Sequence, residues 1–426
     1  MGVKDFRSAK RVISDTATGG TQWRMDSAAL QSLLADHRTG RGISTVVADG
    51  TQEIMTVSPT ASTFGHLALA WEQWVTRKFA LGNTVLICFD VPAGVTAAKQ
   101  AEQHKRLRGG RVVEPFAGDI EYDTLLPPTY AAAVAHRPTR YRFCDWLSMH
   151  LLAEGVSRVI VPSGCTLAIL TPFGVLHETH KRAGAEDMVT SKVETGELFG
   201  EADVSMFALL PRFAKKEDNV VIQSIDSDSV AIGLLFKDVA GWVGNIFVQS
   251  FAPTKKDDSG KSLPRTREYI DVEKLLGICT RQWGDYAASA FTVLCAICGT
   301  DFTGQTRATG LSTESAFSSA LTKPEVITYF RRELFAGVDA DGLPSERAIR
   351  GAVELLYEKR KRQCARAKPM RLSLLARVTR FNLLYWKRCS VGETPPPPTE
   401  HFGFVHSEDG LRVGSTVCDT RRSMFT

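Results

Sequence analysis

The chain lacks the features by which several protein classes are recognised. No apolar run in its 426 residues approaches the roughly 20 residues that a membrane-spanning helix needs. Residues 1–6 are too polar for a secretory signal, so we expect a protein that is not secreted. A Walker-type loop, a G-x-G-x-x-G fingerprint and internal repeats are also missing. These absences argue against a membrane protein, a nucleotide-dependent enzyme and a repeat protein.

Cysteine is scarce and irregularly placed. The nine cysteines are an odd number without regular spacing, which argues against a disulfide scaffold and favours a reducing compartment. Cys295 and Cys298 have the spacing of metal ligands, but they lie in an apolar stretch without a second Cys or His pair. We interpret them as buried core thiols. His177 and His180 lack the four-residue spacing of a zincin.

Charge is nearly balanced over the whole chain but uneven along it. There are 52 Lys and Arg residues against 47 Asp and Glu, and the hydrophobic fraction of 43% is typical of a globular protein. Cations gather in residues 92–142, which we interpret as an insertion, and again in the helical pattern at 357–388. The second cluster fits three interpretations: contacts with nucleic-acid phosphates, an import signal at 359–362, or a solvated helix face.

The apolar runs predict an α/β fold with a parallel sheet. Runs at 43–49 and 83–90 indicate buried strands, and the amphipathic stretch 64–79 between them indicates a helix, which together imply parallel pairing. We also expect strands at 158–161, 220–225, 231–236 and 246–251, and helices at 143–153, 206–213 and 287–297. Residues 166–199 show no strong pattern, so about 164–199 is interpreted as a second insertion, and the tail after Gly392 is expected to be extended.

Acidic residues follow the predicted strands or open a predicted helix. They are Asp49, Asp90, Glu201, Asp203, Asp226, Asp228 and Asp301. A carboxylate at the C-terminal end of a buried strand lies where open α/β sheets bind ligands. Seven carboxylates so placed would repel one another unless cations bind among them, and Mg²⁺ or Mn²⁺ prefers such oxygen ligands. For any one acid alone, a strand-end turn or a helix cap is the simpler interpretation.

These motifs together resemble the flap endonuclease and XPG family of structure-specific 5′ nucleases. The opening Met-Gly-Val-Lys-Asp-Phe is similar to the family's Met-Gly-(Ile/Val)-x-x-(Leu/Phe). Phe-Asp90-Val-Pro resembles its Phe-Asp-Gly-x-x-Pro element, with valine in place of glycine. Gly-Glu201-Ala-Asp203, Asp226-Ser-Asp228 and Gly-Thr-Asp301-Phe resemble its remaining acidic elements. The resemblance covers roughly residues 1–310 and depends on the order of the acids, since each motif alone is short.

The resemblance implies a PIN-like α/β nuclease domain. Its parallel central sheet would be flanked by helices and carry the acids at its C-terminal edge, with residues 92–142 as a basic arch. Residues 1–310 would form this core, 311–391 a helical DNA-binding and basic extension, and 392–426 a Pro-rich tail.

The resemblance also implies a two-metal-ion mechanism. Asp49, Asp90 and Asp203 would favour one Mg²⁺ or Mn²⁺ ion, and Asp226, Asp228 and Asp301 the other, with Glu201 between them. Lys99 and Arg106 keep the seven-residue spacing of the family's two basic residues that contact the scissile phosphate. Lys105 and Arg108 are alternatives for that role, and a solvated helix face is the competing interpretation.

Further nucleic-acid contacts are expected outside the acidic motifs. They are assigned to Gly2, Lys105, Arg108, Arg307, Lys359, Arg360, Lys361 and Arg362. The family's Gly-x-Gly hairpin after the last acid holds K⁺, whereas Gly304 and Gly310 do not keep that spacing, so K⁺ binding is left open. No sliding-clamp motif is found in the tail. These departures are typical of a divergent member, such as one from a protist or a large DNA virus.

The function expected from the sequence is metal-dependent cleavage of DNA at 5′ flaps, nicks or junctions by a monomer in a nuclear or intracellular replication compartment. RNA is a possible substrate. One alternative is a 5′→3′ exoribonuclease-like enzyme, whose acidic elements look similar. Another is a catalytically silent nuclease-like subunit that binds nucleic acid.

Overall fold

The architecture is described from a computed structural model. The structure describes residues 6–16, 22–35, 42–56, 61–91, 116, 118–127, 130–184, 188–194, 200–251, 266–300, 312–357, 369–407 and 410–413.

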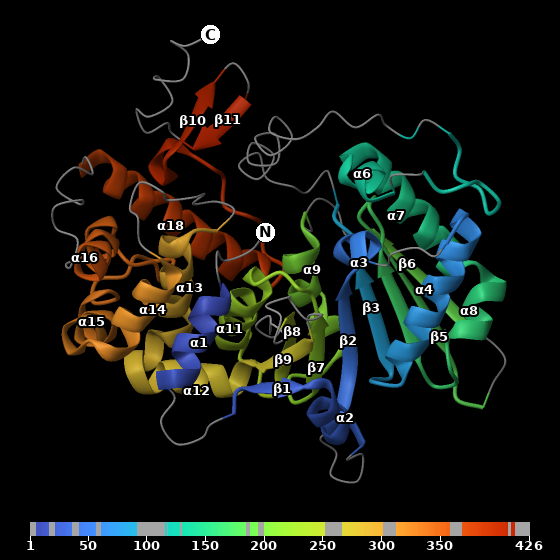
Figure 1. Ribbon diagram of the computed structural model, residues 1–426, viewed down its shortest axis with the longest axis horizontal. Helices are drawn as coiled ribbons and strands as arrows, with labels where there is room; N and C mark the ends of the chain where they lie inside the picture. Colours follow the sequence, from blue (N-terminus) through green and yellow to red (C-terminus); the bar gives the residue numbers. More distant parts are fainter. Residues whose placement is uncertain are drawn as a thin grey trace, which may run out of the picture.

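A nine-stranded sheet runs through this part of the chain, and helices cover both of its faces (Figure 1). Its strands are β1 Arg24–Asp26, β2 Ile43–Asp49, β3 Thr84–Cys88, β4 Thr166–Leu170, β5 Val175–Lys181, β6 Met188–Glu194, β7 Asn219–Gln223, β8 Ile246–Phe251 and β9 Arg267–Asp271. They lie in the order β1-β9-β8-β7-β2-β3-β4-β5-β6. The strands from β8 to β4 pair in parallel, and antiparallel strands extend both sides. The predicted α/β fold with a parallel central sheet flanked by helices is therefore confirmed.

The path of the chain through the parallel strands reverses at β2. From β2 the chain goes to its neighbour β3 and then to β4, and it later returns to β7 on the other side of β2 and continues to β8. Because these strands are parallel, the carboxyl ends of β7, β2 and β3 lie side by side at one edge. Open α/β sheets bind ligands at such a reversal, beyond the carboxyl ends of the strands.

The larger core lies between one face of the sheet and a layer of helices. This layer contains α1 Phe6–Thr16, α9 Ala202–Ala208, α10 Leu210–Phe213, α11 Asp228–Ala240, α12 Val272–Trp283, α13 Ala287–Cys298 and α18 Pro369–Cys389. Helix α13 is buried along its whole length, because α11, α12 and α18 all pack against it. Outside it lie α14 Thr313–Thr322, α15 Pro324–Thr328 and α16 Glu346–Tyr357.

The opposite face of the sheet is covered by a smaller, aromatic core. It involves α3 Gly50–Thr56, α4 Phe64–Phe79, α6 Tyr130–Ala135, α7 Arg137–Leu152 and α8 Glu154–Ile160. Phe64 and Phe143 meet edge to face with ring centroids 4.9 Å apart. The Tyr130 hydroxyl donates to the Ile54 carbonyl at 2.9 Å, which ties α6 to the helix that follows β2. Further along this face, α2 Ser27–Ala35 covers a third small cluster.

Two predicted strands are helices. Residues 231–236 lie in α11, and residues 158–161 lie mostly in α8. The first prediction is wrong because α11 is enclosed by the larger core, so its apolar residues run without helical periodicity. The second is wrong because the apolar run Val159–Val161 is too short to show whether its periodicity is that of a strand or of a helix. The strands expected at 43–49, 83–90, 220–225 and 246–251 and the helices at 64–79, 143–153 and 287–297 are confirmed, with boundaries shifted by a few residues in places.

The segment interpreted as a second insertion, residues 164–199, supplies three strands. β4 pairs in parallel with β3, so it belongs to the central sheet. β5 and β6 extend this side of the sheet as an antiparallel hairpin, and β6 is exposed along most of its length. The polar side chains of β6 therefore face solvent and those of β5 are mostly half-buried, so neither strand contains an apolar run of the kind that predicts a strand. The tail after Gly392 also pairs locally, as β10 Phe404–Ser407 and β11 Gly410–Val413.

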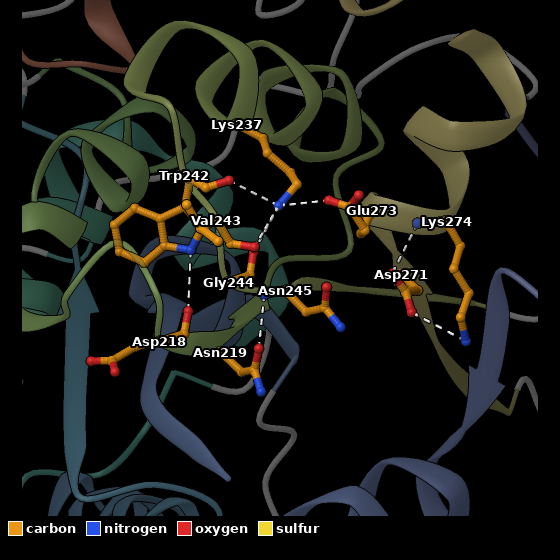
Figure 2. A network of polar contacts seen from close by, with 10 residues as sticks. All are labelled: Asp218, Asn219, Lys237, Trp242, Val243, Gly244, Asn245, Asp271, Glu273 and Lys274. Atoms are coloured by element: carbon orange, nitrogen blue, oxygen red, sulfur yellow. Dashed lines mark hydrogen bonds and ion pairs between the residues drawn. The ribbon is translucent and has the colours of Figure 1, made fainter. Parts of the chain in front are cut away.

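A buried lysine joins α11 to the strand that follows it (Figure 2). Lys237 donates to the carbonyls of Trp242 at 2.9 Å, Val243 at 3.2 Å and Gly244 at 2.8 Å, and it pairs with Glu273 of α12 at 2.7 Å. Gly241 ends α11 with a φ of 59°, a left-handed conformation that favours glycine. These contacts hold the start of β8, at the opposite edge of the sheet from the carboxyl ends of β7, β2 and β3.

All seven cysteines of the described residues are free and buried, including Cys295 and Cys298 within α13. This placement agrees with the interpretation of these two residues as core thiols. Among the described helices, none has the length and apolar character needed to cross a bilayer.

Candidate functional site

Two of the predicted acids stand at the ends of the neighbouring strands β2 and β3. Asp49 is the last residue of β2 and is paired in register with Cys88, while Asp90 follows two residues beyond Cys88. The backbone N–H of Asp90 donates to the Thr51 hydroxyl at 2.7 Å. The turn after β2 is thereby joined to the residue that follows β3, which holds the two carboxylates at one edge.

A third acid approaches from β7, on the other side of β2. Gln223 ends β7 opposite Ala48, and Asp226 follows three residues later. Gln52 bridges the two strand ends, because its Oε1 accepts from the Ile225 N–H at 2.6 Å. The N–H of Gln52 in turn donates to Asp49 Oδ1 at 2.8 Å. One glutamine therefore connects the ends of β2 and β7.

The helix α9 brings two further acids to the same edge. Asp90 Oδ1 accepts from the N–H of Ala202 at 3.0 Å, across 112 residues of sequence. The N–H of Val91 also donates to the Gly200 carbonyl at 2.8 Å. Glu201 and Asp203, which flank Ala202, are both buried. The start of α9 is therefore attached to the end of β3.

The acids at this edge influence one another electrostatically. Burial is the main cause that raises the pKa of Asp49 well above its ordinary value, and the negative charges of Asp90, Asp203 and Asp226 raise it further. The hydrogen bond from the Gln52 N–H acts in the opposite direction and lowers the pKa of Asp49. Asp90, Asp203 and Asp226 therefore all lie within electrostatic reach of Asp49.

The end of α18 closes one side of this edge. Burial raises the pKa of Cys389 to about 12, and the charges of Glu201 and Asp203 raise it as well. Asp228, the first residue of α11, is buried and contributes to the raised pKa of Cys295 in α13, behind burial of that thiol. The C-terminal helices thus pack against the acidic edge from the side of the larger core.

Several acids also have a structural role. Asp49 Oδ1 accepts from the first turn of α3, and Asp226 Oδ1 accepts from the N–H of Asp228 at 3.2 Å, at the start of α11. These are the local contacts of helix-capping side chains. In the described part of the chain, no three His, Cys, Asp or Glu side chains converge closely enough to hold a metal ion as they are placed. Their carboxylate oxygens suit Mg²⁺ or Mn²⁺, so the donor chemistry fits while metal binding stays a prediction.

The remaining predicted site residues lie outside the described residues. They are Gly2, Lys99, Lys105, Arg106, Arg108, Asp301, Arg307, Lys359, Arg360, Lys361 and Arg362. The structure therefore describes six of the seven predicted metal ligands and neither of the two proposed phosphate contacts, Lys99 and Arg106.

Sequence reasoning missed two residues that organise the edge. Thr51 and Gln52 are the second and third residues after Asp49, and both contact the ends of neighbouring strands. Their position just after a predicted strand was visible, but their partners at Asp90 and Ile225 are set by the order of strands in the sheet.

Comparison with known proteins adds a distant structural likeness. No family model matches the sequence, and no curated protein matches it. Among solved structures, the chain is similar to the catalytic core of Rad2 in complex with a DNA substrate. The identity is 12% and the TM-score is 0.32, with 78% of this chain and 92% of that chain covered. This similarity is too low to carry an argument, so function is argued from the residues of this chain.

Proposed function

We propose that this chain is a divalent-metal-dependent nuclease that cleaves DNA at 5′ flaps, nicks or junctions. One observation carries the proposal. Acidic residues follow the ends of the adjacent parallel strands β7, β2 and β3, and the start of α9 is attached beside them, where the chain path through the sheet reverses. That position is where open α/β sheets bind ligands, and the acids around Asp49 raise the affinity of its carboxylate for a proton or a cation.

The acids of such a site would bind two metal ions. Asp49, Asp90 and Asp203 are proposed to hold one ion, and Asp226, Asp228 and Asp301 the other, with Glu201 between them. When bound, Mg²⁺ or Mn²⁺ would stabilise charge on the phosphate and lower the pKa of a water nucleophile.

The chain's own residues keep the strand ends in place and contact the substrate. Thr51 and Gln52 fix the ends of β3 and β7 relative to β2, so the carboxylates would converge on an ion from fixed strand ends. Lys99 and Arg106 are proposed to contact the scissile phosphate.

A second candidate is a catalytically silent protein that binds nucleic acid. It is favoured by the capping contacts of Asp49 and Asp226, which give both acids a structural use without metal. In that case the edge would be a remnant of a nuclease site. The two candidates differ in one respect that is directly measurable, namely strand cleavage in the presence of Mg²⁺ or Mn²⁺.

The test is incubation of the full chain with 5′-labelled flap, nicked, hairpin and single-stranded DNA, and with the matching RNA substrates. Mg²⁺, Mn²⁺ and EDTA are compared for each substrate. The proposal expects cleavage of a junction-containing DNA that needs the added ion and stops in EDTA. Preference for single-stranded RNA would favour the exoribonuclease alternative. Binding without cleavage of any substrate would favour the silent protein.

A further inference from the structure

We propose that Arg140 binds a backbone phosphate of the nucleic-acid strand that occupies the candidate site. This places one side of the strand's path over the start of α7. The inference rests on the proposed function and deepens it, because it names a contact that the acidic motifs do not assign.

The guanidinium of Arg140 has no carboxylate partner in the described part of the chain. None of the ion pairs between described residues includes it. Its Nη1 donates to the Val134 carbonyl over a long 3.4 Å, and its Nε is buried without an acceptor. A guanidinium has five donors, and a buried donor without an acceptor reduces stability. The buried Nε is out of reach of a ligand, so the donors of Arg140 that a phosphate would accept from are those of its two terminal nitrogens.

The half-buried position of this side chain is not that of an ordinary surface arginine. Its guanidinium carbon lies 5.9 Å from the ring centroid of Tyr141, and its Nη1 makes the long hydrogen bond to the Val134 carbonyl. A cation on a freely solvated helix face would instead direct all its donors to water. The contacts of Arg140 orient the guanidinium in advance, which reduces the entropy lost when it binds a phosphate.

The start of α7 lies beside the acidic edge. Figure 1 shows α6 next to α3, the helix that follows β2, and the Tyr130 hydroxyl bonds to Ile54 there. Arg140 is one helical turn before Cys144 on α7. Cys144 belongs to the same core cluster as Ala48 and Phe89, the residues that precede Asp49 and Asp90. The start of α7 and the ends of β2 and β3 are therefore neighbours through α3, which contacts both α6 and α7.

The electrostatics of Cys144 agree with this placement. Burial is the main cause that raises the pKa of the Cys144 thiol, Arg140 lowers that pKa, and Asp90 and Asp49 raise it. The thiol is therefore within reach of charges of both signs. Yet Arg140 does not pair with either acid, so its positive charge stays available. A phosphodiester held between Arg140 and cations on the carboxylates would be neutralised from both sides.

The test compares Arg140→Ala and Arg140→Gln with a matched control, Arg158→Ala. Arg158 lies on α8, is exposed, and pairs with Glu154 within its own helix. DNA binding by the full chain is measured in EDTA over a series of salt concentrations. Loss of the contact should weaken binding on the order of tenfold at low salt, as expected for a charged hydrogen bond. The salt slope should fall by ~0.9 for duplex or ~0.7 for single-stranded contacts. The control should change neither quantity.

A second measurement locates the phosphate and keeps the inference testable if one variant is unstable. Methylphosphonate linkages, which lack the negative charge, are introduced one at a time along the substrate strand. One position should weaken binding by the native protein and have no further effect with Arg140→Gln, since the partners interact. Equal effects of every linkage on both proteins would overturn the inference.

The inference and the proposed function fail in different ways. If the native chain cleaves DNA while Arg140→Gln keeps its affinity, salt slope and linkage pattern, only the Arg140 contact is refuted. If the native chain binds DNA without cleaving it and Arg140→Gln loses one phosphate contact, the contact stands and the nuclease assignment falls. If the native chain binds no nucleic acid, both are refuted.

Discussion

At the scale of single residues, Asp49 combines a structural and a chemical role. Its Oδ1 accepts the N–H of Gln52 at the start of α3, and its carboxylate is buried beside three other acids. The first role needs an acceptor oxygen, which asparagine also supplies. The second needs a negative charge, which asparagine lacks. Asp49→Asn therefore separates the two roles.

We predict that Asp49→Asn makes the metal-free protein more resistant to heat at neutral pH. Burial and neighbouring acids raise the pKa of Asp49 in the folded state, so the folded protein holds this proton to higher pH than the unfolded chain. The free energy of unfolding should therefore fall as pH rises from about 4 through the raised pKa. Thermal unfolding in EDTA between pH 4 and 8 measures this fall, which should be smaller in Asp49→Asn.

The control for this prediction is Asp285→Asn, an exposed acid in the turn between α12 and α13. It should follow the native pH profile. If Asp49→Asn showed the same fall in stability with pH as the native protein, the charge of Asp49 would not destabilise the folded state. Added Mg²⁺ or Mn²⁺ should raise the unfolding temperature of the native protein and of Asp285→Asn more than that of Asp49→Asn.

Gln52 connects the ends of β2 and β7 without being an acid. We predict that replacing it lowers both the stability of the protein and its rate of cleavage. Gln52→Ala leaves the Ile225 N–H without its acceptor, which should cost about 1–3 kcal/mol. Cleavage should fall because Asp226 follows Ile225 directly. Urea unfolding and single-turnover cleavage measure the two effects. Loss of stability with an unchanged cleavage rate would show that Gln52 does not position Asp226.

The acids were predictable from the sequence and their supports were not. Asp49, Asp90 and Asp226 follow apolar runs that are buried on both faces of a parallel sheet, so each could be placed at a strand end. Thr51, Gln52 and Arg140 depend on which elements become neighbours. That information comes from the return of the chain to β7 beside β2 and from the packing of α7.

At the scale of elements, the sequence predicted the strands and helices whose pattern of apolar and polar residues matches which of their sides are buried. The strands β2, β3, β7 and β8 are continuous apolar runs, and α4 alternates buried and exposed sides. The errors fall where this relation breaks down. A fully enclosed helix such as α11 has no polar side, and the half-buried strand β5 and the exposed strand β6 have few apolar residues.

Helix α18 shows that the basic C-terminal region is also part of the core. Phe381, Tyr385 and Trp386 of this helix are buried, and Phe404 packs on Phe381 with ring centroids 4.7 Å apart. A chain ending before α18 would lose these contacts and is expected not to fold. The role of the basic C-terminal region in DNA binding is therefore better tested by replacing its charged residues than by truncating the chain.

We predict that glutamine at Lys359, Arg360, Lys361 and Arg362 weakens DNA binding without unfolding the protein. Each phosphate contact that is lost should reduce the salt slope by ~0.9, because fewer counterions are released. Cleavage should persist at high enzyme concentration, since all seven acids remain. Binding titrations over a salt series, with circular dichroism as the control for folding, measure this. An unchanged slope would indicate a solvated surface or an import signal.

At the scale of the whole molecule, helices from both faces of the sheet reach the edge at which the acids lie. The larger core supplies α9, α11 and the end of α18, and the aromatic core supplies α3 and the start of α7. The sheet between them places the carboxyl ends of β7, β2 and β3 side by side. Changes in either core should therefore affect the edge, whereas Lys237 and its partners stabilise the opposite edge of the sheet.

The most direct test of the central claim is single-turnover cleavage of a 5′-labelled DNA flap by the native chain and by Asp226→Ala, with Asp285→Asn as the control. We predict that the native chain and the control cleave in Mg²⁺ or Mn²⁺ and stop in EDTA. Asp226→Ala should lose cleavage while it keeps DNA binding, because a carboxylate that holds metal is missing and the phosphate contacts remain. Cleavage by Asp226→Ala within a few-fold of the native rate, or native cleavage that persists in EDTA, would contradict the assignment of the acidic edge as a metal-dependent nuclease site.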